Sequence, residues 1–234
     1  MSRFNSRSDQ KEMIDDLYCD GPELRQTFRE LRTINKLLGG NHVTTNGIGK
    51  LLLNLNLTEI TIADIGCGNG DMIRVIVEWA KKKNLETECM GIDANPNTVT
   101  IAEQNLQDLS NASFEAANVF DTDFRQKKVD IITCTLFTHH FTNEELVRMF
   151  ASFGEKARIG MVINDLHRHP LAYYSIKLLT TLFSKSKQVK NDAPVSVLRS
   201  FHKGELAVLL KEAGWGKFQI TWHWAFRWQI VAYK

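Results

Sequence analysis

Thr61-Ile-Ala-Asp64-Ile-Gly66-Cys67-Gly68-Asn69-Gly70-Asp71 is the stretch of this 234-residue chain that decides its fold. A β-prone run ends just after Asp64, three glycines follow at alternate positions, and an apolar-periodic run begins at Met72. This order predicts a strand, a tight turn and a helix, because glycine accepts positive φ and leaves no Cβ between the turn and a bound molecule. In open α/β sheets such a turn lies at the carboxyl ends of the strands, where ligands bind.

The spacing of the glycines distinguishes two kinds of cofactor. A dinucleotide places its pyrophosphate on a helix N-terminus and favours G-x-G-x-x-G, whereas this chain has G-x-G-x-G. Asp64 lies two residues before the first glycine, and a fixed carboxylate there would repel a pyrophosphate but attract an ammonium group. The turn resembles motif I of the class I S-adenosylmethionine-dependent methyltransferases, whose cofactor carries a sulfonium and an ammonium. A dinucleotide-binding turn and a purely structural turn are the alternatives.

Two later positions extend the resemblance. Asp93 closes a second predicted strand about 20 residues past the turn, where a nucleoside-binding fold carries an acid for the ribose hydroxyls. Asn118 follows the third strand, where methyltransferases of this class usually carry an Asp that accepts from the adenine amino group. Its amide oxygen can accept the same bond, or the side chain only shapes a turn. The resemblance implies cofactor contacts from Asp64, Gly66, Cys67, Gly68, Asn69, Asp93, Ala94, Asn118, Val119 and Thr135.

Two adjacent histidines follow the predicted fourth strand. The run Thr135-Leu-Phe-Thr-His139-His140-Phe141 resembles the family's signature after strand 4, and the resemblance implies that the backbone around Thr135 holds the methionine ammonium of the cofactor. An imidazole titrates near neutrality, so His140 or His139 could take a proton from a substrate hydroxyl. In many relatives the pair mostly packs and caps the helix that here begins near Thr142, which is the alternative interpretation.

Strands and helices alternate along the rest of the chain. The predicted strands are 60–65, 87–92, 112–117, 129–134 and 158–164, and the predicted helices between them are 70–83, 96–107 and 143–156. This alternation predicts an α/β fold with a doubly wound parallel sheet. A helix with a glycine stop follows at 203–214, and residues 218–233 predict a hairpin. A final antiparallel pair is typical of the methyltransferase sheet, so we expect the Rossmann-like methyltransferase fold, with seven mostly parallel strands and an antiparallel C-terminal strand.

Two regions lie outside this core. Residues 1–56 predict a helical N-terminal lid and substrate region, with helices at about 8–17, 22–38 and 45–56 and with Asn41 and Gly47 in linkers. The resemblance implies that residues 57–234 are the methyltransferase domain, with a cap segment, 165–200, inserted after the fifth strand. We expect both regions over the carboxyl ends of the strands, where a lid keeps water from the sulfonium.

The inserted segment contains a helical stretch, 171–183. It offers apolar lining from Leu166, Tyr173, Tyr174, Leu178 and Phe183, with polar points at His167, Arg168 and His169. Ordinary core contacts of a helix are the alternative interpretation of Tyr173 and Leu178.

Composition argues against several other classes of protein. A net charge of +2 supplies no basic field for nucleic acid. Four scattered cysteines without a C-x-x-C pair argue against a disulfide framework or a zinc site and favour a reducing, cytoplasmic setting. No apolar run reaches about 18 residues, so membrane insertion is not expected. Asn164 and Asp165 fit only one of the two carboxylate positions of magnesium-dependent catechol enzymes, so we interpret Asp165 as a cap and predict no metal.

These predictions combine into one function. The sulfonium of S-adenosylmethionine makes its methyl group electrophilic, so the protein has mainly to align donor and acceptor and to remove a proton. Residues 13–17 and 35–40 resemble bacterial small-molecule methyltransferases near those that modify quinone and polyketide phenols. We therefore expect O-methylation of a small, largely apolar aromatic or polyketide-like acceptor. A homodimer is consistent with this function. C-methylation of a quinone precursor, an NAD(P)-dependent oxidoreductase and a non-catalytic cofactor-binding protein are the alternatives.

Overall fold

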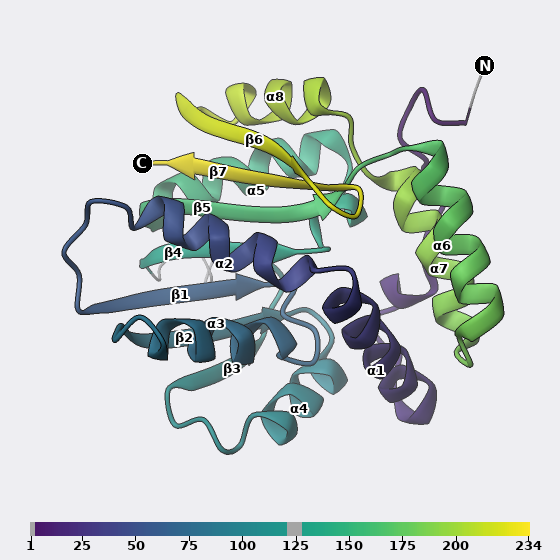
Figure 1. Ribbon diagram of the computed structural model, residues 1–234, viewed down its shortest axis with the longest axis horizontal. Helices are drawn as coiled ribbons and strands as arrows, with labels where there is room; N and C mark the ends of the chain where they lie inside the picture. The colour runs from purple at the N-terminus through teal and green to yellow at the C-terminus, as the bar shows by residue number, and fades with distance from the viewer. Residues whose placement is uncertain (1–2, 121–127) are drawn as a thin grey trace.

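The computed structural model describes residues 3–120 and 128–234, and in this part of the chain seven strands form one sheet (Figure 1). The strands are β1 (Glu59–Ile65), β2 (Glu86–Asp93), β3 (Ala112–Ala116), β4 (Val129–Thr135), β5 (Ala157–Leu166), β6 (Lys217–His223) and β7 (Arg227–Tyr233). Their order is β3-β2-β1-β4-β5-β7-β6. Strands β1 to β5 pair in parallel, while β7 is antiparallel to both of its neighbours. The predicted seven-stranded, mostly parallel sheet with an antiparallel C-terminal strand is confirmed.

Helices cover both faces of the sheet because the central strands carry apolar side chains on both sides. Ile131 packs with α2 (Gly40–Leu51) and α3 (Asp71–Lys81), whereas its neighbour Ile132 packs with α5 (Asn143–Lys156) and α8 (Lys203–Glu212). The same alternation places Val162 and Ile163 on opposite faces. The remaining crossover helix, α4 (Pro96–Asn105), lies against β2 and β3.

The N-terminal region differs from its prediction in two places. Helix α1 (Gly21–Leu37) lies where the sequence placed it, but the helix predicted at 8–17 is wrong and only a short 3-10 turn, Met13–Asp15, forms there. Long-range hydrogen bonds replace helical ones in this segment: Ser8 N–H donates to Leu198 O at 3.0 Å, and Met13 N–H donates to Asp192 Oδ1 at 2.8 Å. Tertiary contacts therefore decide the path of the chain here.

The next helix begins five residues earlier than predicted, so Asn41 and Gly47 lie inside α2 and not in linkers. Gly39 has a φ of 70°, which ends α1 and starts α2 with almost no linker. Gly47 serves close packing against the sheet, because a Cβ at this position would lie 2.5 Å from Val162 Cγ1. Helix α2 therefore packs directly on one face of the sheet and belongs to the hydrophobic core.

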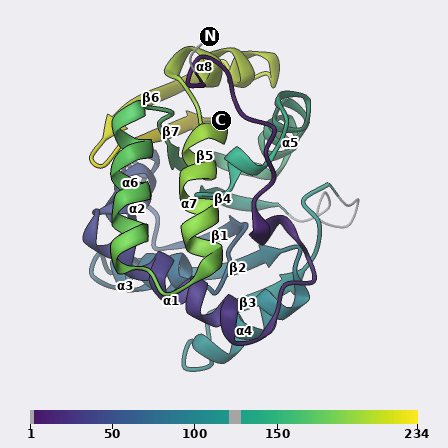
Figure 2. The ribbon, with the colours of Figure 1, turned by 90° about the vertical axis from the view of Figure 1, so that its right-hand side faces the viewer.

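The inserted segment forms two helices, α6 (Pro170–Phe183) and α7 (Lys187–Arg199). They lie side by side across the carboxyl ends of the strands, at the right of Figure 1 and facing the viewer in Figure 2. Helix α7 contains Pro194 and was not predicted from the sequence. Within the described ranges, no helix combines the length and the apolar character needed to cross a bilayer.

We predict that Gly47→Ala lowers the free energy of unfolding by about 1–3 kcal/mol, because the added methyl group overpacks the interface between α2 and Val162. Gly49→Ala in the same helix is the matched control, since its Cβ would lie an ordinary 3.6 Å from Trp79. The control should be neutral or stabilising by up to about 1 kcal/mol through helix propensity. Urea unfolding measures both variants, and equal stability of the two would contradict the tight packing of α2.

Candidate active site

The glycine turn joins β1 to α3 in a conformation that side chains disfavour. Gly66 has a φ of 69°, and a Cβ there would lie 2.1 Å from the ring of Phe137. The amides of Gly66 and Cys67 donate to Ile92 O at 2.8 and 3.1 Å, which fixes the turn against the end of β2. The turn is therefore held against β2 at the carboxyl edge of the sheet, where α/β folds bind their ligands.

Asp93, at the end of β2, binds the same turn. Its Oδ2 accepts from Gly68 N–H at 3.0 Å and its Oδ1 accepts from Asn95 N–H at 3.0 Å. Burial raises the pKa of the Asp93 carboxyl above its ordinary value, against the lowering effect of these two bonds. A carboxylate has about four acceptor sites, so each oxygen keeps capacity for a further donor.

Asp64, near the end of β1, is almost completely enclosed. It is 2% exposed, and Thr133 Oγ1 donates to its Oδ1 at 2.7 Å. Burial, with a smaller contribution from the charge of Asp93, raises the pKa of Asp64 to about 7. A cation brought to this carboxyl would favour its ionised form.

The other candidate cofactor residues have local partners. Asn118 Oδ1 accepts from Phe120 N–H at 3.0 Å. This bond agrees with the turn-shaping role that the sequence offered beside the adenine contact. Thr135 Oγ1 lies 2.9 Å from Thr44 Oγ1 of α2. One cavity of about 2040 Å³ brings together all the predicted cofactor-binding and catalytic residues: Asp64, Gly66, Cys67, Gly68, Asn69, Asp93, Ala94, Asn118, Val119, Thr135, His139 and His140. Of the lining predicted from the inserted segment, Leu166, Tyr174 and Leu178 line this cavity, whereas His167, Arg168, His169, Tyr173 and Phe183 do not.

His139 lies in a 3-10 turn, Thr138–His140, directly after β4, and Asp165 of β5 organises this turn. Asp165 accepts from the Thr138 hydroxyl at 2.6 Å and from His139 N–H at 3.1 Å, and its other oxygen lies 2.7 Å from His139 Nδ1. Although burial opposes it, the contact with His139 holds the pKa of Asp165 below its ordinary value. Asp165 is thus a cap, as the sequence suggested, and it also orients an imidazole.

His140 has a different partner, Asp15, which lies near the N-terminus. Its Nδ1 lies 2.6 Å from Asp15 Oδ1, and Asp15 Oδ2 accepts from Arg199 Nη1 at 2.6 Å. Burial acts to raise the pKa of Asp15, but the hydrogen bond with His140 and the charges of His140 and Arg199 bring it below its ordinary value. The imidazole is half-buried and lines the cavity.

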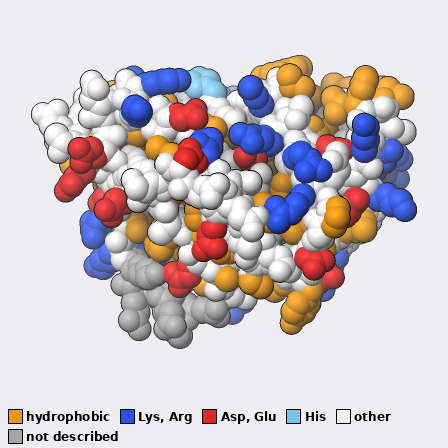
Figure 3. Space-filling view, turned by 90° about the horizontal axis from the view of Figure 1, so that it is seen from below, with side chains coloured by type: hydrophobic (Ala, Val, Ile, Leu, Met, Phe, Trp, Pro, Cys, Tyr) orange, Lys and Arg blue, Asp and Glu red, His pale blue; other side chains and the backbone are white. Residues whose placement is uncertain are grey.

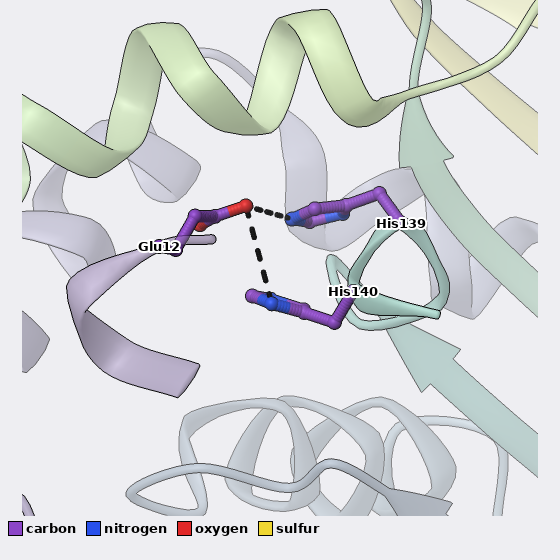
Figure 4. Close-up of side chains that lie close together, drawn as sticks. All are labelled: Glu12, His139 and His140. Atoms are coloured by element: carbon purple, nitrogen blue, oxygen red, sulfur yellow. Dashed lines mark ion pairs between the residues drawn. The ribbon is translucent and has the colours of Figure 1, made fainter. Parts of the chain in front are cut away.

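Glu12 points between the two imidazoles (Figure 4). Its Oε1 lies 3.5 Å from His139 Nε2 and 3.9 Å from His140 Nδ1, while its Oε2 accepts from Ser196 Oγ at 2.7 Å. Burial raises the pKa of Glu12 to about 7. Both Glu12 Oε1 and His139 Nε2 are buried without a hydrogen-bond partner, so one proton shared between them would satisfy both atoms.

Among the described residues, these three side chains are also the group that could hold a metal ion. Their ligand atoms lie within 4.8 Å of one another, and imidazole with carboxylate is a ligand set that suits zinc. Asp15 and Asp165 already occupy the two Nδ1 atoms, so a metal would compete with short hydrogen bonds at His140. The absence of a metal stays a prediction.

Sequence reasoning did not identify Glu12, Asp15 or Arg199 as site residues. Asp15 lies 125 residues from His140 along the chain, and the segment that carries it was interpreted as a helix. Arg7 fixes this segment, because it donates to His139 O at 3.0 Å and to Phe141 O at 2.8 Å. The available signal was two acids, Glu12 and Asp15, at the capping-box spacing that the 3-10 turn uses.

Known proteins share this architecture. Residues 62–160 match a family model described as a methyltransferase domain. The structure is similar to human N-acetylserotonin methyltransferase in complex with SAM, at 16% identity and a TM-score of 0.62, over 91% of this chain and 55% of that one. It is similar to magnesium protoporphyrin IX methyltransferase from Synechocystis PCC 6803 with bound SAH, at 17% identity and a TM-score of 0.56, over 86% of each chain.

A third similar structure is the plantazolicin methyltransferase BpumL in complex with SAH, at 21% identity and a TM-score of 0.61, over 85% of this chain and 72% of that one. No curated protein matches the sequence. At these identities the likeness to solved structures shows the fold alone. Residues 62–160 therefore match a methyltransferase domain, within a chain whose fold is shared with methyltransferases solved with SAM or SAH.

Proposed function

We propose that this methyltransferase acts on a hydroxyl of a small, largely apolar aromatic or polyketide-like acceptor, with His140 as the general base. The unequal placement of the two neighbouring imidazoles carries this proposal. His139 is 2% exposed, with Nδ1 against Asp165 and Nε2 against Glu12, so an acceptor has no access to it. Asp15 occupies Nδ1 of His140, which leaves Nε2 of this cavity-lining imidazole for the acceptor.

The residues of the glycine turn fit a nucleoside that carries an ammonium group. Asp93 has unused acceptor capacity for ribose hydroxyls, and Asp64 is a buried carboxyl that a cation would ionise. Asn118 and the backbone of Val119 would meet the adenine, and the backbone around Thr135 would meet the ammonium. The similar structures of human N-acetylserotonin methyltransferase and BpumL contain SAM and SAH, which supports the same cofactor here.

The bound cofactor supplies an electrophilic methyl group on a sulfonium. His140 Nε2 takes the proton of the acceptor hydroxyl, so that the oxygen becomes a better nucleophile. Asp15 holds the Nδ1–H of His140 in place and stabilises the imidazolium that forms. The cavity walls exclude water and align the acceptor, and such alignment can contribute about 7–11 kcal/mol.

We predict that Asp93→Ala weakens binding of SAM and SAH by about 10- to 100-fold, because one or two hydrogen bonds to a charged group are lost. Asp108→Ala is the control, since Asp108 is an exposed carboxylate that does not itself line the cavity. Isothermal titration with SAM, SAH and NAD measures the affinities. Unchanged SAM affinity in Asp93→Ala would contradict the ribose contact, and binding of NAD instead would contradict the cofactor.

We predict that SAM affinity rises with pH from 6 to about 7.5 and then levels off. The free protein has an Asp64 pKa of about 7, and an adjacent ammonium favours the ionised carboxylate, so binding below this pKa must release a proton. SAM affinity is greatest above the Asp64 pKa and falls by up to about tenfold per pH unit below it. Asp64→Asn should remove the dependence. Glu12→Gln should keep it, although the pKa of Glu12 lies in the same range.

We predict that His140→Gln lowers kcat on a reactive phenol by about 10²- to 10⁴-fold while SAM affinity stays within twofold, because only the general base is lost. SAH release measures turnover, and NMR of the product distinguishes an O-methyl ether from a C-methyl group. Asp15→Asn should lower kcat less and displace the pH profile, since Asp15 acts through His140. Full turnover in His140→Gln would exclude His140 as the base.

A further inference from the structure

Helix α6 presents a stripe of large apolar side chains that its neighbours do not cover. Leu171, Tyr174, Leu178 and Leu182 are spaced three or four residues apart and are 64, 58, 61 and 64% exposed. The opposite side of the helix is packed, where Tyr173 is 7% exposed and its ring lies 5.7 Å from that of Phe4. Figure 3 shows apolar side chains gathered at the right-hand end of the molecule, which carries α6 and α7.

A second apolar stripe faces the same cavity from α1. Phe28, Leu31, Ile34 and Leu38 recur at helical spacing, are half-buried, and line the cavity together with Leu171, Tyr174 and Leu178 of α6. Phe28 also approaches the cofactor turn, since a Cβ on Gly68 would lie 3.3 Å from its ring. Both helices thus line the cavity beside the cofactor turn, and we call the part of the cavity between these two stripes the α1–α6 slot.

The cavity is larger than a cofactor and a single ring require. Its volume is about 2040 Å³, whereas a site for one drug-sized ligand occupies roughly 300–1,000 Å³. His140, the cofactor residues and both walls of the α1–α6 slot line this one cavity. An acceptor whose hydroxyl meets His140 can therefore extend into the slot.

Two polar side chains beside the slot are bonded within the protein. Ser175 Oγ donates to Leu171 O of its own helix at 2.6 Å, and Asn35 Oδ1 accepts from Arg227 Nη2 at 2.8 Å. The two apolar stripes offer apolar burial, which is non-directional and suits a flexible chain. From Leu171 to Leu178 the wall is on the order of 10 Å long at about 1.5 Å per residue.

We infer that the methyl acceptor carries a long alkyl or isoprenoid chain, which lies in the α1–α6 slot while its hydroxylated ring meets His140. This inference rests on the proposed function and specifies its substrate class. The stripe on α6 continues past the cavity to Leu182 and Phe183, so a chain longer than the slot still meets apolar surface. Each methylene buried in the slot should strengthen binding by about two- to fourfold.

The test uses 4-methylphenol, 4-butylphenol and 4-octylphenol with the SAM-bound protein. We expect KM to fall by about two- to fourfold per added methylene, and kcat to change little, because the chain contributes binding far from the reacting oxygen. Leu178→Asp should raise KM for 4-octylphenol at least tenfold more than it raises KM for 4-methylphenol, whose short substituent does not reach the slot. Leu53→Asp is the matched control, an exposed leucine that does not line the cavity.

A KM independent of chain length, or an unaffected KM in Leu178→Asp, would overturn the inference. If none of the phenols is methylated, the proposed O-methylation fails, and the slot is tested separately by titrating 4-octylphenol into the SAH-bound wild type and Leu178→Asp. Tighter binding to the wild type would support the slot, and equal binding would overturn it. A dimer in sedimentation, or pelleting with phosphatidylglycerol vesicles, that Leu178→Asp abolishes would also overturn it, because another occupant would then cover α6.

Discussion

Three strands of the sheet carry a carboxylate at or near their carboxyl ends, and each carboxylate fixes a segment of a neighbouring strand or loop. Asp64 of β1 accepts from Thr133 of β4, Asp93 of β2 accepts from the turn after β1, and Asp165 of β5 holds the histidine turn after β4. Removing these charges from water is costly, and hydrogen bonds offset the cost only in part at Asp64 and Asp93. The edge of the sheet therefore keeps carboxyl groups that a cation or a hydroxyl donor can use.

The sequence was enough to predict those features of the sheet's carboxyl edge that depend on consecutive residues. The glycine turn, the acid at the end of β2 and the cap at Thr142 each follow from a few consecutive residues, and the structure has a capping box between Thr142 and Glu145. The doubly wound, mostly parallel sheet could be predicted for a similar reason, since alternating strands and helices restrict the topology. Even Gly214, the glycine stop of α8, has the expected positive φ of 85°.

Other features depended on contacts across the whole chain and were beyond sequence reasoning. Gly47 resembles a helix breaker until Val162 is placed beside it, and Pro194 hides α7 from a periodicity analysis. His139 and His140 are adjacent in sequence, so nothing local tells which of them is enclosed. The choice is made by Asp165 from β5 and by Glu12 and Asp15 from the N-terminal segment. These partners lie 26 to 127 residues away, and the nearest of them had been interpreted only as a cap.

The helical pair α6–α7 contacts both the acids beside His140 and the apolar wall of the cavity. Helix α7 holds the N-terminal acids in place, because Ser196 donates to Glu12 and Arg199 donates to Asp15. Helix α6 packs against α7 through Tyr173 and Val197 while its other side forms a wall of the cavity. A displacement of this pair would change the carboxylate that orients His140 and the apolar wall at the same time. One pair of helices therefore supplies both the contacts that hold the acid beside His140 and an apolar wall against which an acceptor could lie.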